Sequence, residues 1–174
     1  LLFLPLLRLR ALPRPMIGGL LLVGALQFGV TYICLYLSFE YISVPEVLLF
    51  TIFTPLHIAL VDNLIRRRFS LGPLVAASIS VVGAGIIRYD GLSDSFIRGF
   101  LIMQLANLTF AAGQVGYAHM VRRYQLTART QWQGFGLFFI GAFMVVLPAW
   151  LLLGDHSRLP HTSVQWGVLT WLGL

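Results

Sequence analysis

Long apolar runs dominate the chain, and short polar connectors separate them. Five runs reach or approach the roughly 20 mostly apolar residues that a helix needs to cross a bilayer, namely 16–39, 46–65, 71–87, 96–121 and 132–153. Apolar stretches at 1–7 and 164–174 read as parts of further spans. None of the runs alternates between apolar and polar residues as barrel strands do. The predicted fold class is therefore all-α, a polytopic membrane helix bundle.

The run 71–87 differs from the others because it is short and rich in alanine, serine and glycine. Such small residues let helices approach closely, so we expect this segment to pack tightly against its neighbours. Both ends of the sequence fall inside apolar stretches, and we expect the chain to be a fragment of a longer membrane protein.

Composition agrees with a membrane protein. The chain is 58% hydrophobic and 10% charged, whereas an ordinary soluble domain is about 45–50% apolar and about 25% charged. Too few polar residues remain to cover a soluble core of this size. The net charge of +6 comes from arginines clustered beside the apolar runs, which is typical of membrane flanks and not of a nucleic-acid-binding surface. Cys34, the only cysteine, excludes a disulfide within the chain.

The connectors alternate in charge. Three of them, at 8–14, 66–68 and 122–129, each carry three arginines, and the connectors between them are acidic or mixed. Positively charged connectors stay on the cytoplasmic side of a membrane. The alternation therefore supports the assignment of the spans and predicts that these three connectors are cytoplasmic.

Polar residues form a stripe on the first span. Gln27, Thr31, Cys34, Ser38 and Tyr41 follow one another at helical spacing and share one narrow face. Polar side chains are costly at membrane depth, so such a stripe is expected to face the interior of the bundle.

A second stripe lies on the run 96–121, where Gln104, Asn107 and Gln114 share a face. Two polar faces turned inward are typical of a water-filled cavity that accepts a polar solute, which is the interpretation we favour for the pair. The alternative is that the amides and hydroxyls bond neighbouring helices to one another.

Pro55 interrupts the second span. Proline has no N–H, so we expect the carbonyl of Thr51 to lose its helical partner and the helix to kink. Thr51, Thr54 and His57 follow one ridge at this point and could contact a solute. His57 could also relay a proton. The alternative, a neutral histidine bonded to a neighbouring helix, is favoured over proton coupling.

Other polar residues have local explanations. Glu46 follows Ser43 by three residues, which is the pattern of a capping box at a helix start. Asp62 precedes Arg66 by four residues and is expected to form an ion pair within the helix. Gly83 and Gly113 are expected to permit close helix packing. Signatures of phosphate loops, zinc proteases and paired catalytic carboxylates are missing from the sequence, so we expect neither an enzyme nor a metal site.

Four short features together resemble a known family. They are the stretch "YLSFEYISV" at 36–44, "TPL" at 54–56, the arginines at 66–68 and "SVVGAGII" at 80–87. Their order is similar to that of the drug/metabolite transporter superfamily, in its EamA-type ten-helix branch. The resemblance implies two inverted five-helix repeats, with 1–88 belonging to the first repeat and 96–174 to the second.

The resemblance also implies a function. We expect a secondary transporter of the inner or plasma membrane that moves a small polar or amphipathic metabolite by alternating access, as an exporter. Amino acids, carboxylates and amines are the expected solute classes. The rival hypothesis is a non-transporting assembly subunit. No cofactor and no nucleic acid are expected, and proton coupling and a homodimer stay open.

The predicted substrate-binding residues combine the family's proline with the polar stripes. Only Pro55 is carried over from the family motif. Tyr32 and Phe110 could add apolar contact. The full set is Gln27, Thr31, Tyr36, Thr51, Thr54, Pro55, His57, Gln104, Asn107 and Gln114.

Overall fold

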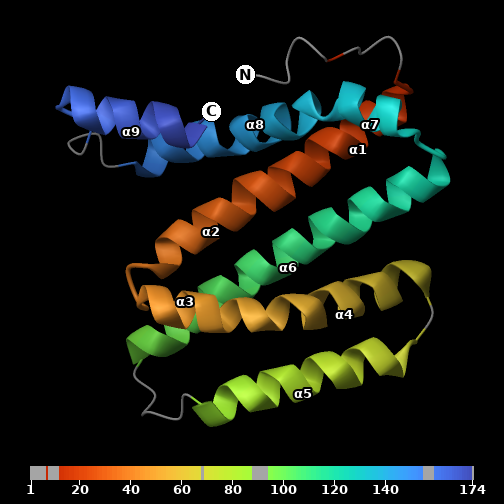
Figure 1. The fold of residues 1–174 in the computed structure, drawn as a ribbon, viewed down its shortest axis with the longest axis horizontal. Coiled ribbons are helices and arrows are strands. Elements are labelled where there is room, and N and C mark those ends of the chain that lie inside the picture. Colours follow the sequence, from red (N-terminus) through yellow and green to blue (C-terminus); the bar gives the residue numbers. More distant parts are fainter. Residues whose placement is uncertain (1–6, 8–11, 68, 88–93, 155–158, 174) are drawn as a thin grey trace.

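The computed structural model describes residues 7, 12–67, 69–87, 94–154 and 159–173, and these residues form helices joined by turns, with no strand among them (Figure 1). In chain order the elements are α1 (Arg14–Gly24), a π-helical segment (Ala25–Val30), α2 (Thr31–Ser38), α3 (Val44–Phe50), a 3-10 segment (Thr51–Phe53), α4 (Thr54–Arg66), α5 (Leu71–Ile87), α6 (Asp94–Arg123), α7 (Ala128–Gly134), α8 (Gly136–Leu153) and α9 (Ser163–Gly173).

Four helical stretches are long and apolar enough to cross a membrane. They are Arg14–Ser38, Val44–Arg66, Ser95–Arg123 and Ala128–Leu153. Each coincides with one of the runs predicted from hydropathy, and α5 coincides with the run 71–87. The prediction of a polytopic helix bundle is therefore confirmed, whereas the total of ten helices stays a prediction. The stretch 1–6 of the first partial span lies outside the described residues.

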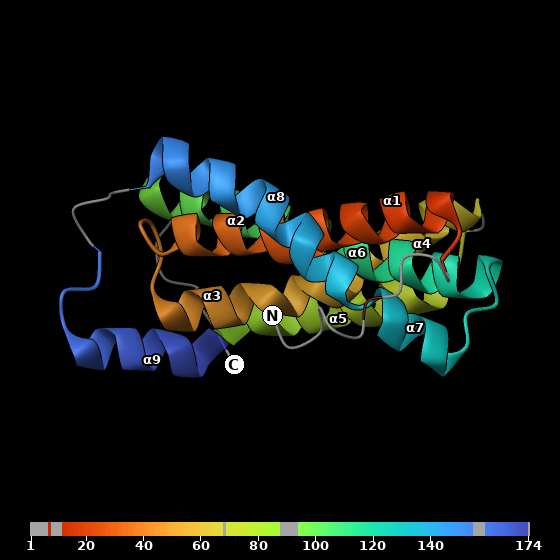
Figure 2. The same cartoon turned by 90° about the horizontal axis from the view of Figure 1, so that it is seen from above.

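The bundle is built around α6. Helices α1 and α2 pack on one side of α6, and α3 and α4 pack on the other (Figure 1). Beyond them, α8 packs against α1 and the π-helical segment, while α5 lies at the opposite edge against α4. The view from above shows α9 apart from α8, although the two overlap in Figure 1 (Figure 2).

The first span contains a π-helical segment. Thr31, the residue after it, donates its backbone N–H to the carbonyl of Leu26 five residues earlier. The Thr31 hydroxyl donates to the same carbonyl at 2.9 Å. A threonine side chain thus supports a local widening of the helix, of a kind that occurs often at functional sites.

The second span begins at a capping box and is interrupted just before Pro55. The carboxylate of Glu46 accepts hydrogen bonds from the backbone N–H and the hydroxyl of Ser43, both at 2.7 Å, which confirms the capping box. Before Pro55 the helix tightens into a 3-10 segment, where the N–H of Thr54 donates to the carbonyl of Thr51. The expectation that the Thr51 carbonyl is a free acceptor is therefore wrong, because the tighter turn supplies a donor in place of the missing proline N–H.

Glycines allow α1 and α8 to cross closely. Gly24 lies against the backbone of Phe138, and Gly141 lies against the carbonyl of Leu21, so neither position has room for a Cβ atom. A buried cluster of Leu12, Met16, Leu20, Val23, Leu137 and Phe138 surrounds this crossing. At the other end of the bundle, a second cluster unites α2, α3 and α6 through Cys34, Ile42, Val47, Phe50, Met103 and Ala106.

The packing of α5 differs from the expectation. Ala77 is buried, but Ile79 and Leu71 are more than half exposed, at 67% and 62%. A Cβ on Gly83 would meet no atom within 4 Å, whereas one on Gly113 would lie 2.6 Å from the Cβ of Gln27. Close approach is thus confirmed at Gly113 and wrong at Gly83, because among the described elements α5 contacts mainly α4 and the 3-10 segment.

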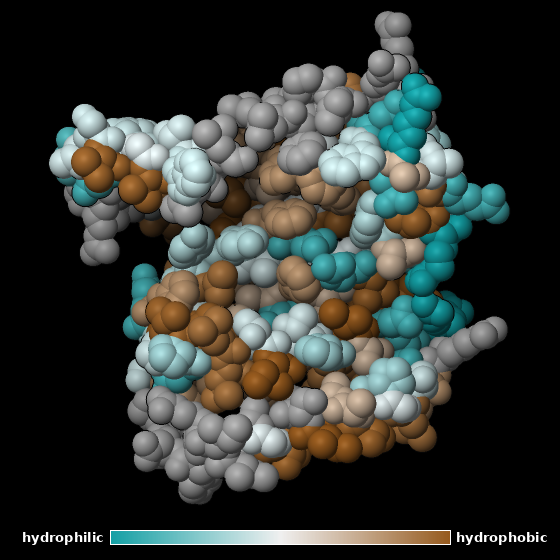
Figure 3. Space-filling view, in the orientation of Figure 1, coloured by the Kyte–Doolittle hydropathy of each residue, from teal (hydrophilic) through white to brown (hydrophobic). Residues whose placement is uncertain are grey.

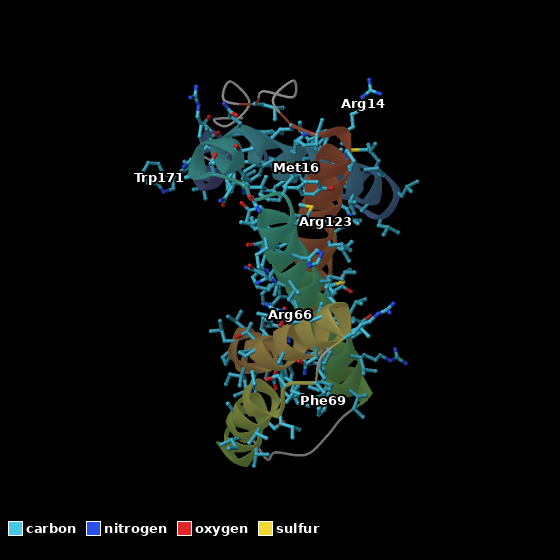
Figure 4. All side chains as sticks on the ribbon, turned by 90° about the vertical axis from the view of Figure 1, so that its right-hand side faces the viewer. Arg14, Met16, Arg66, Phe69, Arg123 and Trp171 are labelled. Atoms are coloured by element: carbon cyan, nitrogen blue, oxygen red, sulfur yellow. The ribbon has the colours of Figure 1, made fainter. Side chains whose placement is uncertain are left out.

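The described arginines of the three basic connectors gather at one end of the bundle. Helix α1 begins there and α4 and α6 end there (Figure 1), and Figure 4 looks onto this end with Arg14, Arg66 and Arg123 labelled. Hydrophilic residues line the same edge in the space-filling view, and hydrophobic ones cover much of the surface over α3 and α5 (Figure 3). Arg8, Arg10 and Arg68 lie outside the described residues.

Candidate functional site

The predicted polar stripe on the first span faces α6, and the side chains of Gln27 and Thr31 pack against that helix. The hydroxyl of Thr31 lies 2.9 Å from that of Thr109 and 3.4 Å from the carbonyl oxygen of Ala106. Ser38 is fully buried and donates to the carbonyl of Leu35. Gln27 lies against Gly113, and its amide makes no hydrogen bond within the described residues. Thr31 therefore bonds the first span to α6, Ser38 is bonded within α2, and none of these three residues lines the cleft described below.

Asn107 connects α6 to the break in the second span. Its side chain is buried, at 3% exposure. The amide nitrogen donates to the carbonyl of Phe50 at 2.8 Å, and the amide oxygen accepts from the hydroxyl of Thr54 at 3.1 Å. Since Thr54 gives its own N–H to Thr51, the Phe50 carbonyl lacks its usual α-helical donor. Asn107 supplies a donor to that carbonyl.

Other predicted residues on the second span bond within their own helix. The exposed Thr51 donates its hydroxyl to the carbonyl of Leu48 at 2.6 Å. The Nδ1 atom of His57 lies 2.9 Å from the carbonyl oxygen of Phe53. Tyr36 is 68% exposed and contacts the ring of Phe39. None of these three lines the cleft described next.

Gln104 stands out because its polar atoms have no partner. Both the oxygen and the nitrogen of its amide are buried, and neither makes a hydrogen bond within the described residues. An unsatisfied buried amide is costly. It lies one turn before Asn107 on α6, so a paired amide and an amide without a partner among the described residues stand side by side.

A cleft of about 650 Å³ opens between α4, the start of α5 and α6, running from the helix break toward the arginine-bearing end. Only Pro55 and Gln114 among the ten predicted residues line it. The lining residues are Pro55, Ile58, Ala59, Asp62, Asn63, Arg66, Ser70, Pro73, Gln114, Val115, Ala118 and Arg122. Ligand-binding clefts in proteins typically measure about 300–1,000 Å³, so the size suits a small metabolite.

The charged residues of the cleft form one linked group. The Nε atom of Arg66 lies 2.8 Å from Oδ1 of Asp62, which confirms the predicted ion pair. The Nη2 atom of Arg122, across the cleft on α6, lies 4.0 Å from the same carboxylate oxygen. Asn63 is held separately by two bonds to the backbone of Ser70. Gln114 is exposed and makes no hydrogen bond within the described residues.

Sequence reasoning missed most of this cleft, although a signal for it existed. Pro55, Asp62 and Arg66 are separated by seven and four residues, which keeps them on one face of a helix. The polar stripe of α6 also continues past Gln114 to Arg122. If both polar helix faces had been extended by two turns toward the arginines, the predicted site would have included Asp62, Arg66 and Arg122.

Comparisons with known proteins show relatives along the whole chain. The chain is 59% identical over 174 residues to a protein of Pseudomonas aeruginosa named "Probable biotin transporter". It is 43% identical to the "Biotin transporter" of Escherichia coli K12 and 42% identical to that of Salmonella typhimurium, each over 175 aligned positions. The chain spans 60% of the first relative's length and 58% of each of the others. No family model and no solved structure matches the chain.

The resemblance to the drug/metabolite transporter superfamily is wrong in the light of these findings. The relatives that match the full chain carry the name of biotin transporters, and no family model supports the EamA assignment. The motifs behind the resemblance are short and built mainly from residues common to membrane helices. The division into 1–88 and 96–174 stays a prediction. All of these relatives are named as transporters and not as enzymes, in agreement with the expected absence of catalysis.

Replacing Asn107 should weaken the fold. We expect Asn107→Ala to lower the free energy of unfolding by about 1–2 kcal/mol, since it leaves the Phe50 carbonyl without this donor inside the bundle. Gln114→Ala is the matched control, because this amide on the same helix is exposed. The measurement is thermal unfolding of the full-length protein in detergent. Equal melting temperatures for the two variants would contradict a structural role for Asn107.

Proposed function

We propose that this chain is part of an inner-membrane transporter that carries biotin. The observation that carries the proposal is similarity along the entire chain, at 59% identity, to a protein named a probable biotin transporter. Four helices able to span a membrane provide the setting that such a protein needs. The proposed activity is that of a protein of the relatives' full length, of which this chain would form more than half.

The relatives' names change two expectations about the solute. They give no support to export, and none to amino acids, carboxylates or amines as the general solute class. They name one compound. Biotin has a cyclic ureido head, a sulfur-containing ring and a hydrocarbon chain that ends in a carboxyl group. A cleft with apolar walls and a few polar groups suits a solute of this kind.

The cleft between α4, α5 and α6 is our candidate for the solute site. Pro55 and Gln114 line it, and the amides of Gln27 and Gln104 elsewhere in the bundle have no hydrogen bond within the described residues. These three glutamines are the predicted residues most available to a solute. Thr31, Thr54 and Asn107 are engaged between helices, which supports the packing role for them.

The rival hypothesis of an assembly subunit draws on these same interhelical bonds. It accounts for Asn107 and Thr31 but leaves the open cleft without a purpose. A transporter accounts for the cleft, and we favour it. Proton coupling through His57 and a homodimer stay open, as they were from the sequence.

The proposed orientation puts the arginine-bearing end of the bundle in the cytoplasm, following the bias of positive connectors. In a cysteine-free background of the full-length protein, Phe69→Cys lies in the connector after α4 and Glu40→Cys in the connector before α3. We expect a membrane-impermeant maleimide added to intact cells to label only Glu40→Cys. Labelling of Phe69→Cys alone would reverse the orientation.

Transport is tested with the full-length protein in a biotin auxotroph that lacks its own uptake system. We expect labelled biotin to accumulate, and we expect Gln114→Ala to slow the transport about 5- to 10-fold, as the loss of about one hydrogen bond implies. Gln133→Ala, in α7 and outside the cleft, is the control and should leave transport unchanged. Absence of biotin transport by the wild-type protein would refute the proposed function.

A further inference from the structure

The cleft holds an uneven number of charges. Asp62 carries one negative charge, while Arg66 and Arg122 carry two positive charges, so the group has a surplus of one positive charge. Within the described residues no other charged side chain lines the cleft. Near a low-dielectric wall such a surplus attracts an anion more strongly than it would in water. The charge balance suits a solute with one negative charge.

The two arginines are held differently. Arg66 lies one turn from Asp62 on α4 and contacts it through Nε at 2.8 Å. Arg122 comes from α6 and reaches the same carboxylate only at 4.0 Å, the limit of an ion pair, with its side chain 53% exposed. A guanidinium has five N–H donors arranged as a fork that matches a carboxylate. Arg122 therefore has donors to offer to a second carboxylate in the cleft.

The rest of the cleft suits the remainder of such a solute. Gln114 lies eight residues before Arg122 on α6, about 12 Å along a helix that rises 1.5 Å per residue. Its amide can both donate and accept a hydrogen bond, as a ureido or other cyclic amide group requires. Between the two ends, Ile58, Ala59 and Val115 provide apolar wall for a hydrocarbon chain.

We propose that Arg122 binds the carboxylate of the transported solute, with Gln114 facing its amide-bearing head. The inference rests on the proposed function for the identity of the solute. When the carboxylate arrives, Arg122 turns from Asp62 to the solute, and Asp62 keeps Arg66. The cleft then carries no net charge, which lowers the cost of holding the loaded site inside a membrane.

The test compares biotin with biotin methyl ester, which has the same rings and chain but no charge. Equilibrium binding of each compound is measured on the full-length purified protein. We expect Arg122→Gln to weaken biotin binding about 10- to 100-fold, the range for a lost charged hydrogen bond, and to leave ester binding unchanged. Arg122→Lys, which keeps the charge without the fork, should give an intermediate loss for biotin.

The matched control is Arg123→Gln. Arg123 neighbours Arg122 on α6 but lies over the ring of Tyr124 and does not line the cleft. Its replacement removes the same charge and should not change the affinity for either compound. Melting temperatures of all variants check that the fold is retained.

The outcomes distinguish the proposed role of Arg122 from the proposed function. Equal losses for acid and ester in Arg122→Gln, or no loss, would overturn the role of Arg122 while biotin binding by the wild-type protein keeps the proposed function. Binding of neither compound by the wild-type protein would overturn both.

Discussion

Inside a bilayer no water is available to satisfy a backbone carbonyl, so a break in a spanning helix must be bonded by the protein itself. Pro55 forces such a break in the second span. In the 3-10 segment Thr51–Phe53 the N–H of Thr54 donates to Thr51, so the Phe50 carbonyl has the poorer hydrogen-bond geometry of a 3-10 turn in place of its α-helical bond from Thr54. Asn107 of α6 donates to that carbonyl at 2.8 Å and also accepts from Thr54. This bridge sets where the broken helix meets α6, and the cleft begins at the next residue, Pro55.

The polar residues of α6 consequently divide into two kinds. Asn107 and Thr109 are engaged with neighbouring helices and hold the bundle together. Gln114 and Arg122, farther along the same helix, face the cleft with hydrogen-bonding groups to spare. Gln104 lies on the other side of Asn107, and its buried amide atoms have no hydrogen-bond partner in the described part of the chain. Helix α6 thus carries both the interhelical bonds of Asn107 and the side chains of Gln114 and Arg122 that are available to a solute. This arrangement suits a protein whose helices move around a bound molecule.

Hydropathy and helical spacing predicted the parts of the structure that depend on local sequence. The spans, the capping box at Ser43 and the ion pair between Asp62 and Arg66 all follow from residues a few positions apart. Of the predicted stripes, Cys34, Ser38 and Asn107 turn toward the bundle interior as expected, whereas Tyr41 and Gln114 are exposed. Their periodicity could not distinguish a cavity wall from a packed interface, because both require polar residues on one helix face.

Long-range pairing was the part that the sequence could not reveal. Nothing near Asn107 in the chain indicates that it bonds the carbonyl of Phe50, 57 positions away. The free carbonyl expected at Thr51 was wrong because the helix tightens to a 3-10 turn there, in which the N–H of Thr54 donates to the Thr51 carbonyl. The cleft depends on how α4, α5 and α6 meet, and of its lining only Pro55 and Gln114 were among the predicted substrate-binding residues.

The proposed position of biotin is the cleft between α4, α5 and α6. The most direct test is protection of an introduced thiol in the purified full-length protein, in a background without other cysteines. Ala118→Cys lines the cleft, whereas His119→Cys is exposed on the same helix outside it. We expect biotin to slow maleimide labelling of Ala118→Cys and to leave that of His119→Cys unchanged. Equal labelling of Ala118→Cys with and without saturating biotin would contradict the claim.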